Sequence, residues 1–181
     1  MSAAHEDVEF GTGLAPTTSR DEVDLVVGAW SEARPDVDLA PMQIFSRIDR
    51  IAQLLDLHRR RTFQAHELEP WEFDVLAALR RAGAPYRLSP GRLLRETHVT
   101  SGTMTNRVDR LAAKGLVHRA QDPRDGRGVL VELTDDGLAL VDRALVALVD
   151  LEARLLSQWS PTERDELASY LRRLLLASDP A

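Results

Sequence analysis

The sequence predicts a mainly α-helical protein with one small β-hairpin. Through most of the 181 residues, apolar side chains recur at intervals of three and four, which is the period of an amphipathic helix. At residues 129–133 the interval changes to two, shortly after an Asp-Gly turn signal at 125–126, as expected for a hairpin. With 44% hydrophobic and 29% charged residues, the chain can bury a core and is not disordered by composition.

The first forty residues are predicted to form a tail and a separate short helix. Residues 1–18 lack an apolar period and are expected to be a mobile tail. Ser19 and Glu22 have the spacing of a capping box, with Ser19 as the N-cap. The apolar residues that follow lie at helical spacing: Val23, Val26, Val27 and Trp30. Pro35 ends this helix, so residues 19–40 form an extension helix and its linker, and the helix needs a docking surface to be stable.

A long helix and three short ones come next. The long helix lies in residues 41–66 and carries one apolar stripe: Ile44, Ile48, Ile51, Leu55 and His58. The first short helix runs over residues 70–82, with a proline at its start and a glycine just after its end. The second begins at Ser89. The third begins near Thr100 or Ser101 and ends at the glycine at 115.

The rest of the chain is predicted to be a hairpin and two helices. Residues 117–133 form the hairpin, with Arg124 and Arg127 near its tip. One helix starts at Thr134, and the last starts at Ser160, whose spacing from Glu163 is that of a capping box.

This order of elements is that of a winged helix-turn-helix. In that geometry the last of the three short helices enters the major groove of DNA, and the hairpin reaches the neighbouring minor groove. The DNA-binding domain would then span residues 67–134. The helices in 41–66 and 135–181 have more apolar surface than one small core can cover, so a partner subunit is expected and these segments are assigned to dimerisation.

The third short helix has an outward face suited to base recognition. Met104, Val108 and Leu111 fall within roughly 40° of one another on the helical wheel, and a glycine, a hydroxyl, an amide and a guanidinium fall on the far side. Asparagine pairs with adenine and arginine with guanine in the major groove. The candidate DNA-binding residues, including the hairpin arginines, are Ser101, Thr103, Asn106, Arg110, Arg124 and Arg127.

The charge distribution agrees with a nucleic-acid partner although the net charge of −6 is acidic. Residues 1–40 carry nine acids and two bases, so the remaining chain sums to +1. Residues 89–127 carry eight bases against four acids. A concentrated basic segment is the electrostatic footprint of a DNA binder.

Several segments resemble the MarR family of transcription regulators over roughly residues 41–176. They are WEFDVLAAL at 71–79, TMTNRVDRL at 103–111, KGLV at 114–117, DPRDGR at 122–127 and VELT at 131–134. The resemblance implies a homodimer formed by the first and last helices of the fold that the family shares. It also implies binding to a palindromic operator, commonly with repression relieved by a small ligand.

The extension before residue 41 resembles the urate-responsive branch of that family. In that branch one Trp from the extra helix, one Asp and two Arg are associated with ligand response, and Trp30, Asp74, Arg107 and Arg119 match them. A planar anionic ligand would suit such a set, because it can stack on indole, accept from arginine and donate N–H to a carboxylate. Such a ligand would act on DNA binding through Arg107, which lies on the recognition helix.

Other interpretations of these four residues remain. Asp74 could form a structural ion pair with an arginine, Trp30 could dock the extra helix, and Arg107 or Arg119 could contact phosphate. The same groups suit a xanthine, a phenolic compound or another organic acid. A regulator without an effector, or an activator, has the same sequence features.

The sequence argues against an enzyme, a cofactor and a metal. It has no cysteine, which excludes disulfides, thiolate-bound metals and thiol-based redox sensing. The five histidines show no metal-ligand spacing, and no nucleophile elbow or phosphate loop is present. No secretory signal or membrane-length apolar run is found, so a cytoplasmic location is expected.

Overall fold

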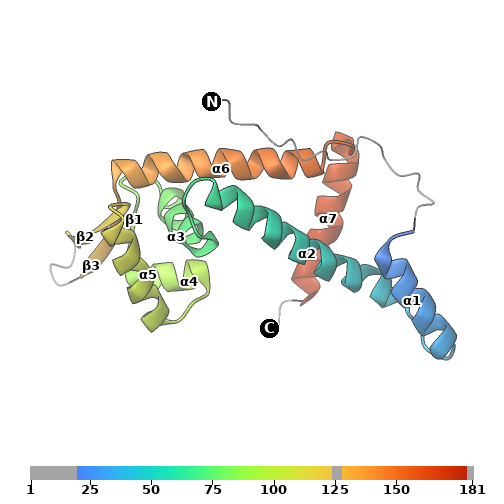
Figure 1. The fold of residues 1–181 in the computed structure, drawn as a ribbon. Coiled ribbons are helices and arrows are strands. Elements are labelled where there is room, and N and C mark those ends of the chain that lie inside the picture. Colours follow the sequence, from blue (N-terminus) through green and yellow to red (C-terminus); the bar gives the residue numbers. More distant parts are fainter. Residues whose placement is uncertain (1–19, 124–127, 179–181) are drawn as a thin grey trace. The chain divides into compact units, whose positions relative to one another are not determined.

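The computed structural model describes residues 20–123 and 128–178 (Figure 1). Within these residues the fold is mainly helical with one small sheet, as predicted. The elements in chain order are α1 (Glu22–Ala33), α2 (Ala40–Gln64), α3 (Pro70–Arg81), β1 (Arg87–Leu88), α4 (Pro90–Thr97), α5 (Ser101–Ala113), β2 (Val117–Gln121), β3 (Val129–Leu133), α6 (Asp135–Leu155) and α7 (Pro161–Ser178). No helix in the described residues is long and apolar enough to cross a membrane.

The chain forms two compact units. One contains α1, the first part of α2 and α7, and the other covers residues 53–157. The main hydrophobic core belongs to the second unit, where α3 contributes the fully buried Val75, Leu76 and Leu79. The apolar residues expected to face inward from α5, namely Met104, Val108 and Leu111, are buried in the same core.

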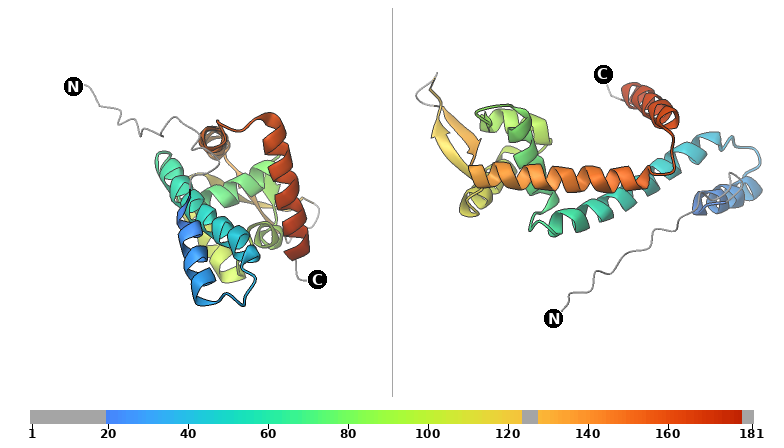
Figure 2. Two further views of the ribbon diagram at one scale, coloured as in Figure 1. Left: turned by 90° about the vertical axis from the view of Figure 1, so that its right-hand side faces the viewer. Right: turned by 90° about the horizontal axis from the view of Figure 1, so that it is seen from above.

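The sheet has three antiparallel strands in the order β1-β3-β2. Strands β2 and β3 are the predicted hairpin, with Arg119 opposite Val131 in the register. Figure 2 shows this hairpin at the end of the unit where α6 begins. Strand β1 was not predicted from the sequence, because two residues are too short to show an alternating pattern. It pairs Leu88 with Val131 and extends the sheet on the other side of β3.

The C-terminal end of α5 is bonded to the start of α6. Gly115 has a φ of +72°, and the N–H of Leu116 donates to the carbonyl of Leu111 at 3.0 Å, which closes the helix as expected for a glycine after its last turn. The hydroxyl of Thr134, the N-cap of α6, donates to the Gly115 carbonyl at 2.8 Å. Gly137 of α6 packs directly against the backbone of Leu116, and a Cβ added at position 137 would overlap the Leu116 carbonyl.

The predicted cap of α1 was wrong by two residues. Asp21 is the N-cap, not Ser19, and Asp24 completes the capping box, not Glu22. The Asp21 carboxylate accepts from the N–H of Asp24 at 3.1 Å, and the Asp24 carboxylate accepts from the N–H of Asp21 at 2.9 Å. Aspartate caps a helix as well as serine does. The pairs Ser19–Glu22 and Asp21–Asp24 have the same spacing, so the sequence alone does not show which of them caps the helix.

Helix α1 is bonded to α2 by ion pairs within its own unit. Arg47 of α2 donates to Asp21 at 2.8 Å and to Asp24 at 2.8 Å. The hydrogen bond to Arg47 is the main reason that the pKa of Asp21 is lowered. Val23 and Val27 are the buried residues of α1, whereas Trp30 is 50% exposed.

Candidate nucleic-acid interface

Helix α5 presents an exposed polar face opposite its buried one. Ser101, Thr103, Asn106 and Arg110 are all exposed. Thr100 is the N-cap, and its hydroxyl lies 3.0 Å from the hydroxyl of Thr103. Thr103, Asn106 and Arg110 line one cavity, whereas Ser101 lines another. The other two candidates, Arg124 and Arg127, lie outside the described residues.

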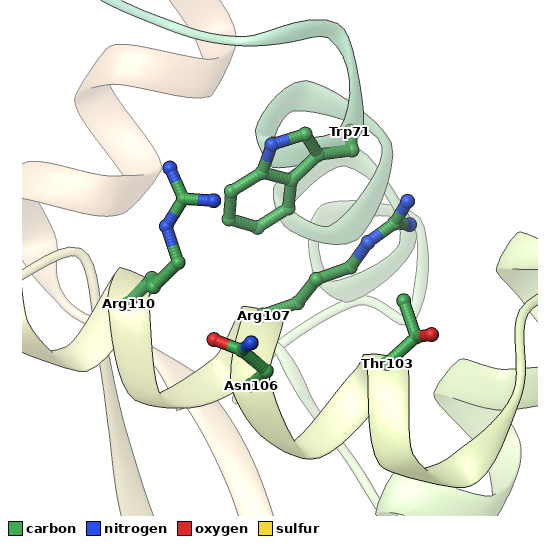
Figure 3. A pocket seen from close by; sticks show the side chains of 5 residues that line it. All are labelled: Trp71, Thr103, Asn106, Arg107 and Arg110. Carbon is green, nitrogen blue, oxygen red and sulfur yellow. The ribbon is translucent and has the colours of Figure 1, made fainter.

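A cavity of about 290 Å³ lies between α5 and the start of α3. Its lining residues are Trp71, Thr103, Asn106, Arg107 and Arg110 (Figure 3). The guanidinium carbon of Arg110 lies 4.7 Å from the centroid of the Trp71 ring, and that of Arg107 lies 5.3 Å from it. Both distances are within the range of a cation–π interaction.

Asp74 lies three residues after Trp71 on α3, on the same side of the helix. Desolvation by the surrounding protein raises the pKa of Asp74, although part of its side chain is exposed, and the charge of Arg107 opposes this shift. Arg59 and Arg81 oppose it more weakly. No described residue forms a direct ion pair with Asp74, so its carboxylate lies among cations without a bonded partner.

Arg119 occupies a different place from Arg107. It lines a second cavity of about 100 Å³ with residues of α4, α5 and β3, and it forms an ion pair with Asp109 at 2.7 Å. Arg107 and Asp109 are about 160° apart around α5, because each residue turns the helix by about 100°. The charge of Arg107 thus acts on Asp74, whereas Arg119 lies near the opposite side of the helix, paired with Asp109. Trp30 belongs to the other compact unit.

No role at this surface was predicted for Trp71 from the sequence. Its contacts are with α5, more than thirty residues along the chain, and a helical period cannot reveal them. The one available signal was its spacing of three from Asp74, which puts an indole and a carboxylate on one face.

Lys114 was also missed as a structural residue. It is the only lysine of the chain and forms an ion pair at 2.8 Å with Glu72, whose side chain is completely buried. A buried carboxylate needs such a partner, because an unpaired buried charge is strongly destabilising. This pair joins the end of α5 to α3.

Comparisons with known proteins agree with this geometry. The sequence model of the MarR family matches residues 66–128. The chain is 37% identical over 153 residues to the HTH-type transcriptional regulator PecS of Dickeya dadantii (strain 3937), which covers 84% of this chain and 92% of that protein.

Two solved structures are similar in fold. A variant of Escherichia coli MarR in complex with operator DNA has a TM-score of 0.62 at 28% identity, covering 81% of this chain and 97% of that chain. Bordetella bronchiseptica BpsR, whose DNA binding is regulated by 6-hydroxynicotinic acid, has a TM-score of 0.62 at 27% identity, covering 76% of this chain and 94% of that chain. The chain belongs to the MarR family and is a DNA-binding transcription regulator with a winged helix-turn-helix fold, not an enzyme.

Proposed function

We propose that this regulator is a repressor that binds a palindromic operator as a homodimer and is released by a small anionic ligand such as urate. The observation that carries the proposal is the position of Arg107. This residue lies on the recognition helix, contacts Trp71, and is the cation with the strongest effect on the desolvated carboxylate of Asp74. A ligand held at Asp74 and Arg107 would therefore act directly on the helix that reads DNA.

The DNA contacts follow from the exposed face of α5. We expect the exposed Asn106 and Arg110 to contact base edges. Ser101 and Thr103 lie in the first turn of the helix, and we expect their hydroxyls to bond phosphates. Arg124 and Arg127 would contact the adjacent minor groove from the hairpin, as arginines do in such grooves.

Dimer formation is supported by apolar side chains that the single chain leaves exposed. In α7 no residue is buried, although Leu171 and Leu175 belong to its apolar stripe and Leu175 is 72% exposed. Helices α2 and α6 also expose large apolar residues, among them Ile44, Phe45, Ile51, Leu145 and Val149. Apolar surface on this scale normally lies in an interface.

The ligand class follows from the groups available to bind it. Arginine donates bidentate charge-assisted hydrogen bonds to a planar anion, and a carboxylate accepts from ring N–H groups. Urate offers both, and we assign its binding to Asp74 and Arg107. Trp30 and Arg119, the other two residues of the predicted set, stay sequence-based predictions. BpsR provides a parallel, since a planar nitrogen heterocycle with an acidic group regulates its DNA binding.

Release requires only that the ligand prefer the DNA-free arrangement of α5. Coupling free energies between ligands are typically about 1–3 kcal/mol, or about 5- to 150-fold in affinity. An anion that draws Arg107 toward Asp74 gives such a preference, because it removes one cation from the DNA-facing surface.

A gel shift with the DNA flanking the gene of this regulator tests the proposal. The wild-type protein should retard that DNA in preference to random DNA of the same length, and urate should weaken the complex more than xanthine, salicylate or citrate does. If another of these compounds weakened the complex instead, urate would not be the ligand. If none of them weakened it, the proposal of a repressor released by a small anionic ligand would be contradicted. Transcription from the flanking promoter in vitro should fall when the protein is added, whereas a rise would identify an activator.

A further inference from the structure

Trp71 holds two arginines of the recognition helix at once. Arg107 and Arg110 are three residues apart on α5, so they share a side of the helix, and Figure 3 shows both reaching toward the indole. Their guanidinium carbons lie 5.3 and 4.7 Å from the ring centroid. Trp71 itself packs against the hydrophobic core, which limits the motion of the ring.

The contact leaves the hydrogen-bond donors of both arginines available. In the part of the chain that the structure describes, neither Arg107 nor Arg110 forms an ion pair or a hydrogen bond to a protein acceptor. A guanidinium that stacks on an aromatic ring still has its five N–H groups directed outward around its edge. Long arginine side chains otherwise lose much rotamer freedom when they bind, and a preset rotamer lowers that loss.

We propose that Trp71 is a positioning residue for DNA recognition, which holds Arg107 and Arg110 on the DNA-facing surface with their donors free for base edges or phosphates. Asn106 and Thr103 line the same cavity, so the preset arginines flank the residues assigned to base and phosphate contacts. The inference rests on the proposed function, since it needs α5 to be the DNA-reading helix. It assigns to α3, outside that helix, a part in setting the affinity for DNA.

Three variants of Trp71 separate the aromatic face from simple packing. Trp71→Phe keeps a π face, Trp71→Leu keeps apolar packing without one, and Trp71→Ala removes both. Two exposed cation–π contacts correspond to about 5- to 30-fold in an equilibrium constant. We expect Trp71→Leu and Trp71→Ala to weaken binding of the flanking DNA by this factor and Trp71→Phe to retain most of the wild-type affinity. Thermal unfolding of each variant checks that the fold is intact.

Double-mutant cycles between Trp71→Leu and Arg110→Met, and between Trp71→Leu and Arg107→Met, show whether the effect passes through the arginines. Loss of Trp71 should cost less once one of its two arginine partners is gone, so the combined effect in each cycle should be smaller than the product of the single ones. The inference would be overturned if Trp71→Leu bound the flanking DNA as tightly as the wild type, or if the losses were fully additive in both cycles. The proposed function would still stand, because the wild-type protein would still bind that DNA.

Fluorescence gives a second readout that does not depend on DNA. With Trp30 and Trp159 replaced by Phe, Trp71 is the only emitting tryptophan of the chain. In this background Arg110→Met should raise the quenching of Trp71 by neutral acrylamide, because the guanidinium no longer covers the ring. Unchanged quenching would overturn the contact. Failure of the wild-type protein to bind the flanking DNA would instead overturn the proposed function, and the role of Trp71 in DNA recognition with it.

Discussion

Asn106 is an exposed residue of α5 on which base preference is expected to depend. Its amide lines the cavity shared with Trp71 and the two arginines. Because an amide can bond adenine through two hydrogen bonds, Asn106→Ala should lower the preference for the correct base by about 1–3 kcal/mol at one position of each half-site. Competition binding with singly substituted operators measures this. A loss of equal size on operator and random DNA would make Asn106 a backbone contact instead.

Asp74 is expected to stabilise the folded chain less than a neutral residue would. Its pKa is raised in the folded state by desolvation, against which Arg107 acts only in part. The ionised carboxylate therefore destabilises the fold at neutral pH, and this effect disappears as the pH falls through the raised pKa and below the unfolded value. Asp74→Asn should unfold at a higher temperature than the wild type at pH 7, with the difference shrinking toward pH 4, and should bind the operator without answering to urate.

Asp21 is a matched control for that measurement. Its pKa is lowered, chiefly by the hydrogen bond from Arg47, so its ionised form stabilises the fold above the unfolded pKa. Asp21→Asn should therefore lower the unfolding temperature at pH 7, and this loss should disappear at acid pH. Two aspartates with the same sign of effect would contradict the desolvation of Asp74.

Individual residues were predictable where their role depends on local pattern. The burial of Met104, Val108 and Leu111 and the exposure of Asn106 and Arg110 followed from one helical wheel. The contacts of Trp71 and the Asp109 partner of Arg119 were not predictable, because they join elements distant in sequence.

At the scale of elements, the junction between α5 and α6 leaves no space for a larger residue at position 137. A Cβ there would overlap the Leu116 carbonyl, and both groups belong to backbone that is fixed by hydrogen bonds. Gly137→Ala should lower the free energy of unfolding by about 1–3 kcal/mol, the usual cost of overpacking. Chemical denaturation measures the loss.

Gly91→Ala is the control, since its added Cβ meets nothing within 4 Å. It should not destabilise the protein, and Ala is the better helix former by up to about 1 kcal/mol. Equal losses in the two variants would show that the junction is not the cause.

Helix boundaries were predicted correctly where the sequence offers a single capping or terminating residue. The predicted start at Ser89 and the predicted end at Gly115 are both confirmed: Ser89 is the N-cap of α4, and Gly115 follows α5 with a φ of +72°. The start of α1 was misplaced because Ser19 and Asp21 have equivalent capping chemistry. Strand β1 depends on pairing with β3, which no local pattern encodes.

For the whole molecule, the exposed apolar stripe of α7 predicts an obligate partner. Leu171→Glu combined with Leu175→Glu should convert a dimer into a monomer, and operator affinity should fall because two half-sites can no longer be bound together. Sedimentation or light scattering measures the mass. Glu166→Lys lies on the opposite side of the helix, about 160° from the Leu171–Leu175 stripe, and should leave the dimer intact. A monomeric wild-type protein, or a dimeric double variant, would contradict the assignment.

The fold of the whole chain was predictable because its elements follow one another in a distinctive order, and the family comparison agrees with that order. The place of Arg119 was less predictable, because it pairs with Asp109, far around α5 from Arg107. Sequence spacing gives no measure of such distances.

The hydrogen bonds from Thr134 to the Gly115 turn make the C-terminal end of α5 a fixed pivot. A helix of 13 residues is about 20 Å long, so a tilt of about 5° around that end would move the first turn by about 1.7 Å. Arg110, only about 5 Å from the pivot, would move by less than about 0.5 Å. A hydrogen bond tolerates a displacement of only a few tenths of an ångström. A small rotation would thus break the bonds from Ser101 and Thr103 to DNA, while Arg110 kept its contact with DNA. During release from the operator, the DNA contacts of the N-terminal turn of α5 would then be lost first. Contacts nearer to Gly115 would be lost later.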